Sequence, residues 1–374
     1  MEAIQFNIFG VFSLFGAIQG FILAIIFAFH SSFTKRANWF LSLLLLTLSL
    51  ASFWGAMEET PLYRNYPILE LLPLVWAGLV APLTYFFIKF LTNPAYKIKN
   101  WEYLLFLSFI IDTLVRFYFL AKFQTGNFDI ERDRYTYYAI RKIIEIIDSV
   151  IGIAVLVNAI QTLKKYELQL LGNYSDISDK SLRWLHRLLI GGGVLCLIWL
   201  NSAFAFFYTA VDINYGRSLW MGISVLIYWI GYGMLIQREL FMNESISEIV
   251  EPPEKVSKLS DKTEEHYQNL LIAIEEKELF RNPNLNMTLL AKEVGLSKGY
   301  LSLIINQKEE KNFFELINAY RVKDVKLKMN DPNFSHYSIF GIALEAGFKS
   351  KSTFNSVFKK MTGLTPTQFR KSSK

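Results

Sequence analysis

Seven apolar stretches of about 20 residues fill the first 240 positions and limit what this chain can fold into. A helix of that length spans roughly 30 Å, the thickness of a bilayer's hydrocarbon core. The stretches lie at residues 8–30, 37–57, 68–91, 101–120, 140–163, 184–209 and 218–240. We therefore predict seven membrane-spanning helices. The alternative is a large soluble protein with buried helices, but such helices normally keep a polar face.

Lysine and arginine are distributed unevenly among the loops between these stretches. One alternate set of loops holds ten of them and the other set holds five. Since Lys and Arg favour the cytoplasmic side, we expect the N-terminus outside the cell and residues 263–374 inside. An acid, Glu2, precedes the first stretch, which is longer than a signal-peptide core, so we expect this stretch to be retained.

Ionisable side chains within the predicted spans form a candidate signal pocket. Asp112 and Arg116 lie four residues apart, so they share a helix face and can pair; Glu145 and Asp148 lie in the next span and Asn201 in the one after. Because ionisable groups in a spanning helix usually face a partner or a watery cavity, we interpret the five as a pocket open to the outside. The alternatives are a simple helix-bridging pair and a wetted helix end.

Cysteine and histidine usage indicates neither a redox nor a metal centre. Cys196 is the only cysteine, and the four histidines are scattered without metal-ligand spacing. The sequence has no Gly-rich phosphate loop and no nucleophile elbow. We therefore expect no enzyme, no metal and no cofactor. Glycines at 16, 20 and 191–193 instead predict close helix approach.

A polar segment divides the chain into its parts. Residues 241–262 contain Pro252-Pro253 and mixed charge without an apolar period, which predicts a short, partly stiff linker. We accordingly predict a membrane region at 1–240, this linker, and a water-soluble domain at 263–374.

An internal repeat organises the soluble domain. The segments "NMTLLAKEVGLSKGYLSLIIN" and "SIFGIALEAGFKSKSTFNSVFK" align at an offset of 52 residues, and of 53 after the turn. Asn286 and Ser338 are predicted to cap a helix in each copy. Gly295 and Gly347 can take the left-handed conformation of a tight turn. Each copy therefore predicts two helices joined by a turn.

The second helix of each copy has one apolar and one polar face. The apolar positions recur at i, i+3 and i+4, and they are Leu301, Ile304 and Ile305 and, in the second copy, Phe354, Val357 and Phe358. The opposite faces carry Lys298, Gly299, Ser302, Leu303 and Asn306 and, in the second copy, Lys351, Ser352, Asn355, Ser356 and Lys359. Lysines and short polar side chains suit the phosphates and base edges of a DNA major groove.

Charge and length favour the same interpretation. Residues 312–329 predict a long amphipathic helix that would hold the two copies apart. Residues 311–374 contain 12 Lys and Arg against 4 Asp and Glu, and a net charge of +8 favours binding to phosphates. The alternative is a basic helical surface that contacts another protein.

Residues 263–372 resemble the DNA-binding domain of the AraC/XylS family of bacterial transcription regulators. The resemblance is carried by "IALEAGFKSKSTFNSVFKKMTGLTPTQFRK", with its F-x-x-x-F-K run and closing G-x-[TS]-P-x-x-[FY]-R. It implies two helices in successive major-groove segments. The implied base or nearby contacts are Lys298, Gly299, Ser302, Lys351, Ser352, Asn355 and Ser356, and the implied phosphate contacts are Lys359 and Lys360. The first copy departs from the family pattern at Gly299 and Leu303.

These observations together predict an all-α protein: a seven-helix membrane region followed by an AraC-type domain with two helix-turn-helix subdomains on a long helix. We expect a one-component transcription regulator of the bacterial inner membrane that senses a periplasmic or lipid-phase signal. Its expected partners are double-stranded promoter DNA, the lipid bilayer and a small signal molecule, with a homodimer left open. The alternatives are a transporter or channel with a cytoplasmic regulatory domain, and a membrane enzyme.

Overall fold

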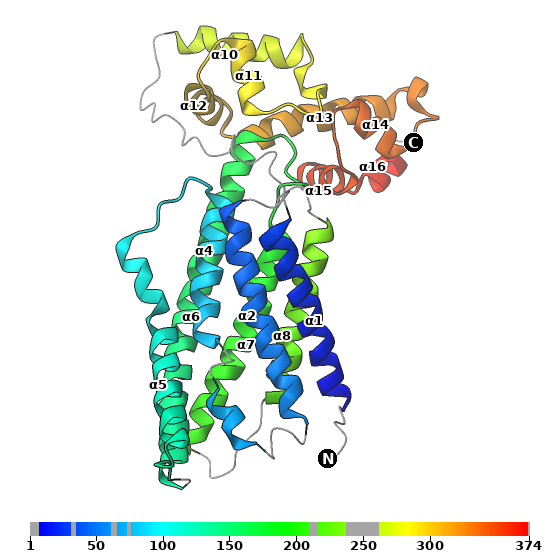
Figure 1. Ribbon diagram of the computed structural model, residues 1–374. Helices are drawn as coiled ribbons and strands as arrows, with labels where there is room; N and C mark the ends of the chain where they lie inside the picture. The colour runs from blue at the N-terminus through cyan, green and yellow to red at the C-terminus, as the bar shows by residue number, and fades with distance from the viewer. Residues whose placement is uncertain are drawn as a thin grey trace. The chain divides into compact units, whose positions relative to one another are not determined.

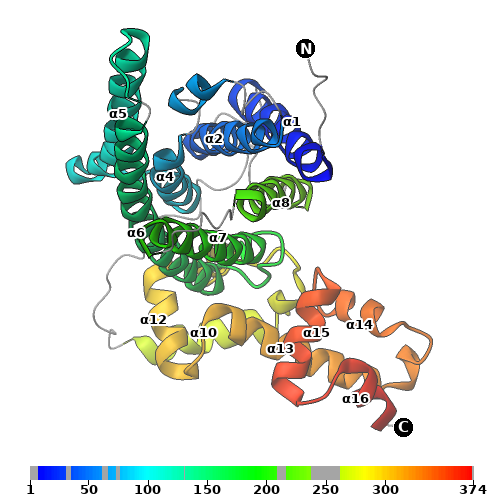
Figure 2. The same cartoon turned by 90° about the horizontal axis from the view of Figure 1, so that it is seen from below.

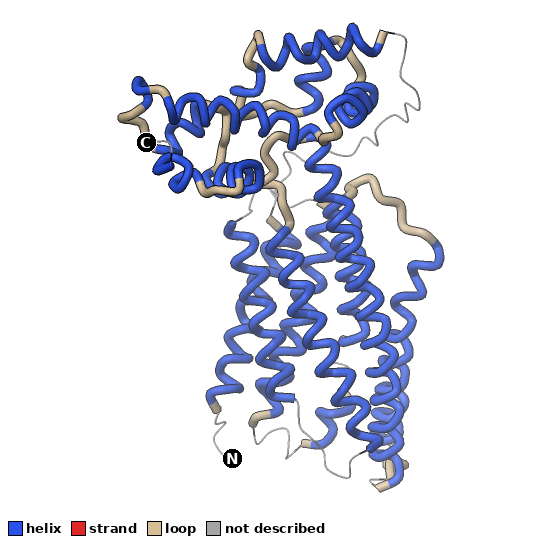
Figure 3. The backbone as a smooth tube through the Cα atoms, turned by 180° about the vertical axis from the view of Figure 1, so that it is seen from behind, coloured by secondary structure: helices blue, strands red, loops and turns tan. Residues whose placement is uncertain are grey.

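The fold is helical throughout the part of the chain that the structure describes. This structure, a computed structural model, describes residues 7–30, 35–60, 66–72, 76–129, 131–208, 216–236 and 262–372. Within these residues the regular elements are α-helices and short 3-10 helices, with no β-strand, as Figure 3 shows. The predicted linker at 241–262 lies, apart from Lys262, outside the described residues.

Contacts along the chain divide it into two compact units. The bundle unit comprises residues 1–164 and 182–247, and the C-terminal unit comprises residues 165–181 and 248–374. The segment 165–181 therefore packs with residues that follow it by about a hundred positions. The sequence-based division at residue 240 assigns the segment 165–181 to the membrane region, whereas its contacts are with the C-terminal unit.

Six helices of the bundle are long and apolar enough to cross a membrane (Figure 1). They are α1 (Ile8–Phe29), α2 (Arg36–Glu58), the continuous helix Asn100–Gln124 that includes α5 (Leu107–Gln124), α6 (Arg132–Asn173), α7 (Arg183–Tyr208) and α8 (Gly216–Ile236). The predicted span at 68–91 contains a 3-10 helix, Pro67–Leu71, and a shorter apolar helix, Ala77–Thr92, which includes α4 (Val80–Thr92). Sixteen helical residues cover roughly 24 Å, less than the hydrocarbon core.

Small residues bring α1, α2 and α8 together, and the end view in Figure 2 shows these helices side by side. A Cβ added at Gly16 would lie 2.7 Å from Ser224 Oγ on α8, and one added at Gly20 would lie 2.0 Å from Ser49 Oγ on α2. Between α2 and α8 the hydroxyls of Ser52 and Ser224 are 2.7 Å apart. The close approach predicted for Gly16 and Gly20 is confirmed.

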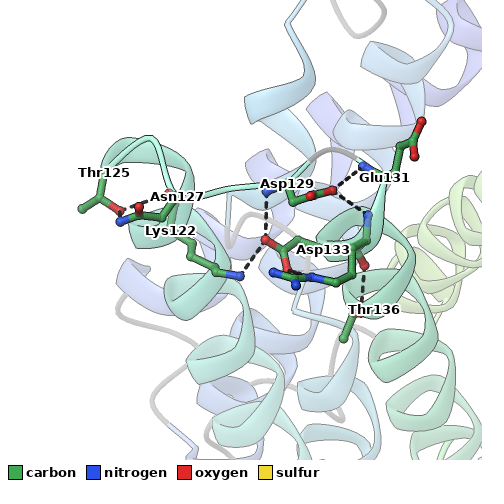
Figure 4. A network of polar contacts seen from close by, with 8 residues as sticks. Lys122, Thr125, Asn127, Asp129, Glu131, Asp133 and Thr136 are labelled. Atoms are coloured by element: carbon green, nitrogen blue, oxygen red, sulfur yellow. Dashed lines mark hydrogen bonds and ion pairs between the residues drawn. The ribbon is translucent and has the colours of Figure 1, made fainter.

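A polar network shapes the connection between α5 and α6 (Figure 4). Lys122 Nζ donates to Asp133 Oδ2 over 2.6 Å, and the Asp129 amide donates to the same oxygen over 2.9 Å. The Asp129 carboxylate in turn accepts the amide hydrogens of Glu131 and Arg132. These contacts satisfy backbone groups that the first turn of α6 leaves without partners. They fix where α6 begins.

The C-terminal unit contains seven described α-helices in addition to the end of α6. They are α10 (Thr263–Glu275), α11 (Met287–Val294), α12 (Lys298–Glu309), α13 (Phe313–Asn330), α14 (Ile339–Glu345), α15 (Lys351–Thr362) and α16 (Pro366–Ser372). One apolar core joins α10, α11, α12 and the start of α13, and a second joins the rest of α13 to α14 and α15. Thus α13 contributes to both cores and connects them.

Candidate nucleic-acid interface

The first helix pair, α11 and α12, is built by a cap and a turn. The Asn286 side chain accepts the Leu289 amide hydrogen over 2.9 Å and so caps α11. Gly295 ends the helix at φ +68°, in the left-handed region that glycine enters without a steric penalty. The Leu296 amide then donates to the Ala291 carbonyl over 2.9 Å, which closes the turn before α12. The turn and cap that the sequence predicted are confirmed.

The second pair, α14 and α15, repeats this construction. Ser338 caps α14 by accepting the Gly341 amide hydrogen over 2.9 Å, and Gly347 takes φ +93° in the turn. Here the turn is also crowded, because a Cβ at Gly347 would lie 2.7 Å from the carbonyl oxygens of Phe280 and Arg281. Glycine is therefore required at this position for space as well as for backbone conformation.

The apolar faces of α12 and α15 are buried in the two cores, as their spacing predicts. The buried side chains are Leu301, Ile304 and Ile305 on α12 and Phe354, Val357 and Phe358 on α15. Burial of these faces leaves the opposite faces of the two helices to the surface. The two pairs are connected by α13, which the sequence predicts as one long helix.

The polar faces of the two helices differ in exposure. On α15 the exposed residues include Lys351, Ser352, Asn355, Ser356, Lys359 and Lys360. On α12, Asn306 is exposed, whereas Lys298, Gly299, Ser302 and Leu303 are half-buried. The structure thus presents all the predicted contact residues of the second copy, and one of those of the first copy fully.

Lys360 has a contact that the sequence interpretation missed. Its ammonium group lies 3.0 Å from a carboxylate oxygen of Glu315 on α13. That ammonium group holds the pKa of the Glu315 carboxyl below its usual range. Glu315 also forms a capping box with Asn312 at the start of α13. Lys360 therefore joins α15 to α13, while its neighbour Lys359 is exposed.

The strongest omission of the sequence interpretation is the segment before α7. Ser175, which is 1% exposed, donates its hydroxyl hydrogen to the Leu285 carbonyl over 2.7 Å. The Ser175 carbonyl accepts from Asn318 Nδ2 over 2.9 Å, and its hydroxyl accepts from Arg321 Nη2 over 3.1 Å. Asn318 and Arg321 both lie on α13 with no exposed surface. The sequence indicates this contact only through Asn318 and Arg321, two polar residues that lie three positions apart on the buried face of α13.

In the bundle unit, three of the five predicted pocket residues, Asp112, Arg116 and Glu145, belong to one ion-pair network, and Arg141, which was not predicted, connects Asp112 to Glu145. Arg116 Nε lies 2.8 Å from Asp112 Oδ2. Arg141 lies 3.6 Å from both Asp112 and Glu145. Lys142 Nζ is also 2.8 Å from Glu145. Asp112 and Glu145 thus each face two cations, and the contact between α5 and α6 is made by Arg141 and Asp112.

A cavity of about 180 Å³ lies in the bundle unit beside this network. Its lining is mostly apolar and comes from α2, α4, α5, α6, α7 and α8. It includes Leu48, Phe87, Val155, Trp199 and Ile223. Glu145 and Asp148 line the cavity, whereas Asp112 and Arg116 lie outside the lining. Asn201 is exposed on α7 and also lies outside it. Among the described residues, no group of three His, Cys, Asp or Glu side chains is placed to hold a metal ion.

Comparison with known proteins bears on the C-terminal part of the chain. The chain is 36% identical over 83 residues to the melibiose operon regulatory protein of Escherichia coli K12, covering 22% of this chain and 26% of that protein. It is 28% identical over 148 residues to an HTH-type transcriptional regulator of Staphylococcus aureus strain COL, covering 40% of this chain and 17% of that protein. The chain therefore spans only 26% and 17% of the length of these curated relatives, and no solved structure matches it significantly. Residues 290–372 match the profile of a family described as a helix-turn-helix domain.

Proposed function

We propose that this chain is a membrane-bound one-component transcription regulator that binds promoter DNA through two helix-turn-helix motifs. The motifs are the pairs α11–α12 and α14–α15, with α12 and α15 as the recognition helices. The observation that carries the proposal is the polar, basic face of α15, fully exposed on a domain that matches the helix-turn-helix family. Both similar proteins are regulators by name.

The chemistry of this face supports contact with DNA. Asn355 and Ser356 are short polar side chains that can reach base edges, and Lys351 and Lys359 can neutralise phosphates. Two recognition helices on one long helix would enter successive major-groove segments of one duplex face, about 10 base pairs apart. Asn306 is the best-placed contact on α12, because it is the most exposed of the predicted residues there.

Sequence selection from a random duplex pool tests this function. The full chain is used in lipid nanodiscs, because the segment around Ser175 belongs to the C-terminal unit. We expect enrichment of two submotifs about 10 base pairs apart. The matched pair of variants is Asn355→Ala, on the recognition face, and Lys323→Ala, which is exposed on α13. Salt-sensitive binding without any enriched motif, at both of two salt concentrations, would contradict the proposal.

The bundle unit is proposed as the sensor, with seven spans, the N-terminus outside and the C-terminal domain in the cytoplasm. This requires the shorter helix Ala77–Thr92 to act as the third span. The cavity supports sensing of a small, largely apolar molecule from the periplasm or the lipid phase. A cavity of comparable size, about 150 Å³, holds benzene in a soluble protein. The ion pairs around Asp112 and Glu145 balance their charges locally, which favours a neutral ligand over an ion.

A further inference from the structure

The residues 174–176, between α6 and α7, form what we call the strap. Tyr174 makes an isolated antiparallel bridge with Asn286, the residue that caps α11. Ser175 bonds to the Leu285 carbonyl and to Asn318 and Arg321 of α13. All of these residues belong to the C-terminal unit. The strap is therefore part of the folded domain and not a surface loop lying upon it.

The strap supplies hydrogen-bond acceptors that α13 needs. Arg321 is completely buried, and burial lowers the pKa of its guanidinium to about 10, so it remains charged at neutral pH. Its hydrogen bonds go to Ser175 and to the carbonyls of Phe280 and Asn282. A buried charge that loses acceptors is strongly destabilising. Withdrawal of Ser175 would therefore alter the position of α13.

The strap also reaches the second helix pair. Asp176 Oδ1 accepts the Thr353 hydroxyl hydrogen over 3.1 Å, and Thr353 lies in the first turn of α15. The carboxylate is well placed there, because the N-terminal end of a helix favours negative charge. The three residues of the strap thus bond to the start of α11, to α13 and to the start of α15. They fix the two helix pairs relative to each other through contacts that α13 alone does not provide.

An engaged strap is compatible with DNA binding. With the Asp176–Thr353 bond in place, Lys351, Ser352, Asn355 and Ser356 are all exposed. Binding of two major-groove segments at once requires a fixed separation of α12 and α15, and fixing it beforehand lowers the ordering cost of binding. The strap follows directly after Asn173, the last residue of α6, and α6 is a single helix from Arg132 onward.

We propose that the strap preorganises the two recognition helices for simultaneous binding, and that α6 is the route by which the bundle unit controls DNA binding. A shift of α6 that withdraws the strap releases the two helix pairs from their fixed spacing. This inference rests on the proposed function, because it concerns the regulation of the same DNA-binding surface.

The first test compares two acidic residues of one short segment. Asp176→Ala removes the acceptor of the Thr353 hydroxyl and of the Ser178 amide, while Asp179→Ala changes an exposed neighbour. The full chain in nanodiscs is titrated with a duplex holding both selected submotifs and with duplexes holding one. For Asp176→Ala we expect about tenfold weaker binding to the double site, equivalent to about 1.4 kcal/mol, and unchanged binding to single sites. Asp179→Ala should bind like the unaltered chain.

Two results would overturn the inference in different ways. If Asp176→Ala binds the double site as tightly as the unaltered chain does, the strap has no role in positioning. If the unaltered chain selects no motif, the proposed function fails together with the inference. Failure of the proposed function is therefore distinguished from failure of the inference alone, in which the unaltered chain still selects motifs.

A crosslink provides a second measurement that does not depend on weakening the fold. Cys196 is the only cysteine, so Cys196→Ser gives a background in which Asp176→Cys and Thr353→Cys can be joined to each other as a disulfide by mild oxidation. Because the side chains at these positions are in hydrogen-bond contact, the two thiols are placed within reach of each other. We expect the crosslinked chain to keep its affinity for the double site. Loss of binding on crosslinking would show that DNA requires release of the strap and would overturn the proposal.

Discussion

Individual side chains on α15 divide into those suited to bases and those suited to the backbone of DNA. Asn355 and Lys359 are one helical turn apart and both exposed, so they face the same partner with different chemistry. Lys360 differs from its neighbour because Glu315 already engages it. Lys360 has to give up its ion pair with Glu315 before it can bind a phosphate. We therefore expect Lys360 to contribute less to DNA affinity than Lys359 does.

Replacement of Asn355 and Lys359 by alanine should separate the two kinds of contact. Asn355→Ala should cost about 1–3 kcal/mol against the preferred base at one operator position and relax selectivity there. Lys359→Ala should weaken binding evenly across sequences and reduce the slope of log affinity against log salt by about one. Binding isotherms on an operator and its single-base variants, at several salt concentrations, measure both effects. Equal selectivity profiles for the two variants would rule out this assignment of roles.

The two turn glycines should respond differently to alanine. Gly295→Ala places a Cβ in open space at φ +68° and should cost about 1–2 kcal/mol. Gly347→Ala at φ +93° also brings the Cβ within 2.7 Å of two carbonyl oxygens, so its cost should be larger. Pulse proteolysis of the C-terminal unit in urea, on the full chain, gives the two free energies of unfolding. Equal costs would mean that backbone conformation alone sets the penalty.

Sequence patterns predicted these local features because each depends on neighbours in the chain. The caps at Asn286 and Ser338, the two turn glycines and the buried faces of α12 and α15 follow from spacing within a few residues. The hydrogen bond from Arg321 to Ser175 joins positions 146 residues apart. No periodicity encodes such a contact, so the strap could be found only in the folded chain. Arg141, which connects Asp112 to Glu145, was missed for the same reason.

Among the elements, α6 departs furthest from its predicted length. The apolar stretch predicts residues 140–163, whereas the helix runs for 42 residues, or roughly 63 Å, from Arg132 to Asn173. The apolar composition predicts only the segment of a helix that can lie in lipid. The backbone hydrogen bonds of α6 continue through the polar residues before and after that segment, so the helix is longer than the apolar stretch. The third predicted span errs in the opposite sense, since its described residues form a 3-10 helix, Pro67–Leu71, and the shorter helix Ala77–Thr92.

The glycines of α7 provide a test of the cavity. Close packing was predicted at 191–193, but a Cβ at Gly192 would have no heavy atom within 4 Å, and Gly192 lines the cavity. Gly192→Leu should therefore fill space and raise the melting temperature of the bundle in nanodiscs. Val194→Leu, at an exposed position of the same helix, should leave it unchanged. A fall in melting temperature for Gly192→Leu would indicate a packed site, since overpacking costs about 1–3 kcal/mol.

On the scale of the whole molecule, the two units are joined through α6 as well as through the chain that follows α8. In the proposed mechanism, a change in the bundle reaches the surface formed by α12 and α15 along this continuous helix. Such energetic coupling requires that the bundle has two arrangements, one with signal bound and one without. It also requires that the strap is bound differently in each of them.

Insertion of four glycines after Lys164 should uncouple the units. Gly192→Leu biases the bundle, and we expect it to change affinity for the double site in the unmodified chain and to have no effect in the insertion variant. The insertion breaks the helix, because glycine costs about 1 kcal/mol per residue in a helix interior. The same insertion after Lys97, an exposed residue of the loop between α4 and Asn100, serves as the control for added length. An equal effect of Gly192→Leu with and without the insertion at 164 would exclude transmission along α6.

The strap has a further consequence for synthesis of the protein. Ser175 leaves the ribosome well before its partners, since Leu285 follows 110 residues later and Arg321 follows 146 residues later. At roughly 5–20 residues per second, the interval before Arg321 is translated is about 7–30 s. Throughout that interval the strap lacks its full set of hydrogen-bond partners. A chain that stops before Arg321 never acquires all of them. Completion of translation is thus a condition for the strap to join the two helix pairs, and an interrupted chain lacks the fixed spacing of α12 and α15.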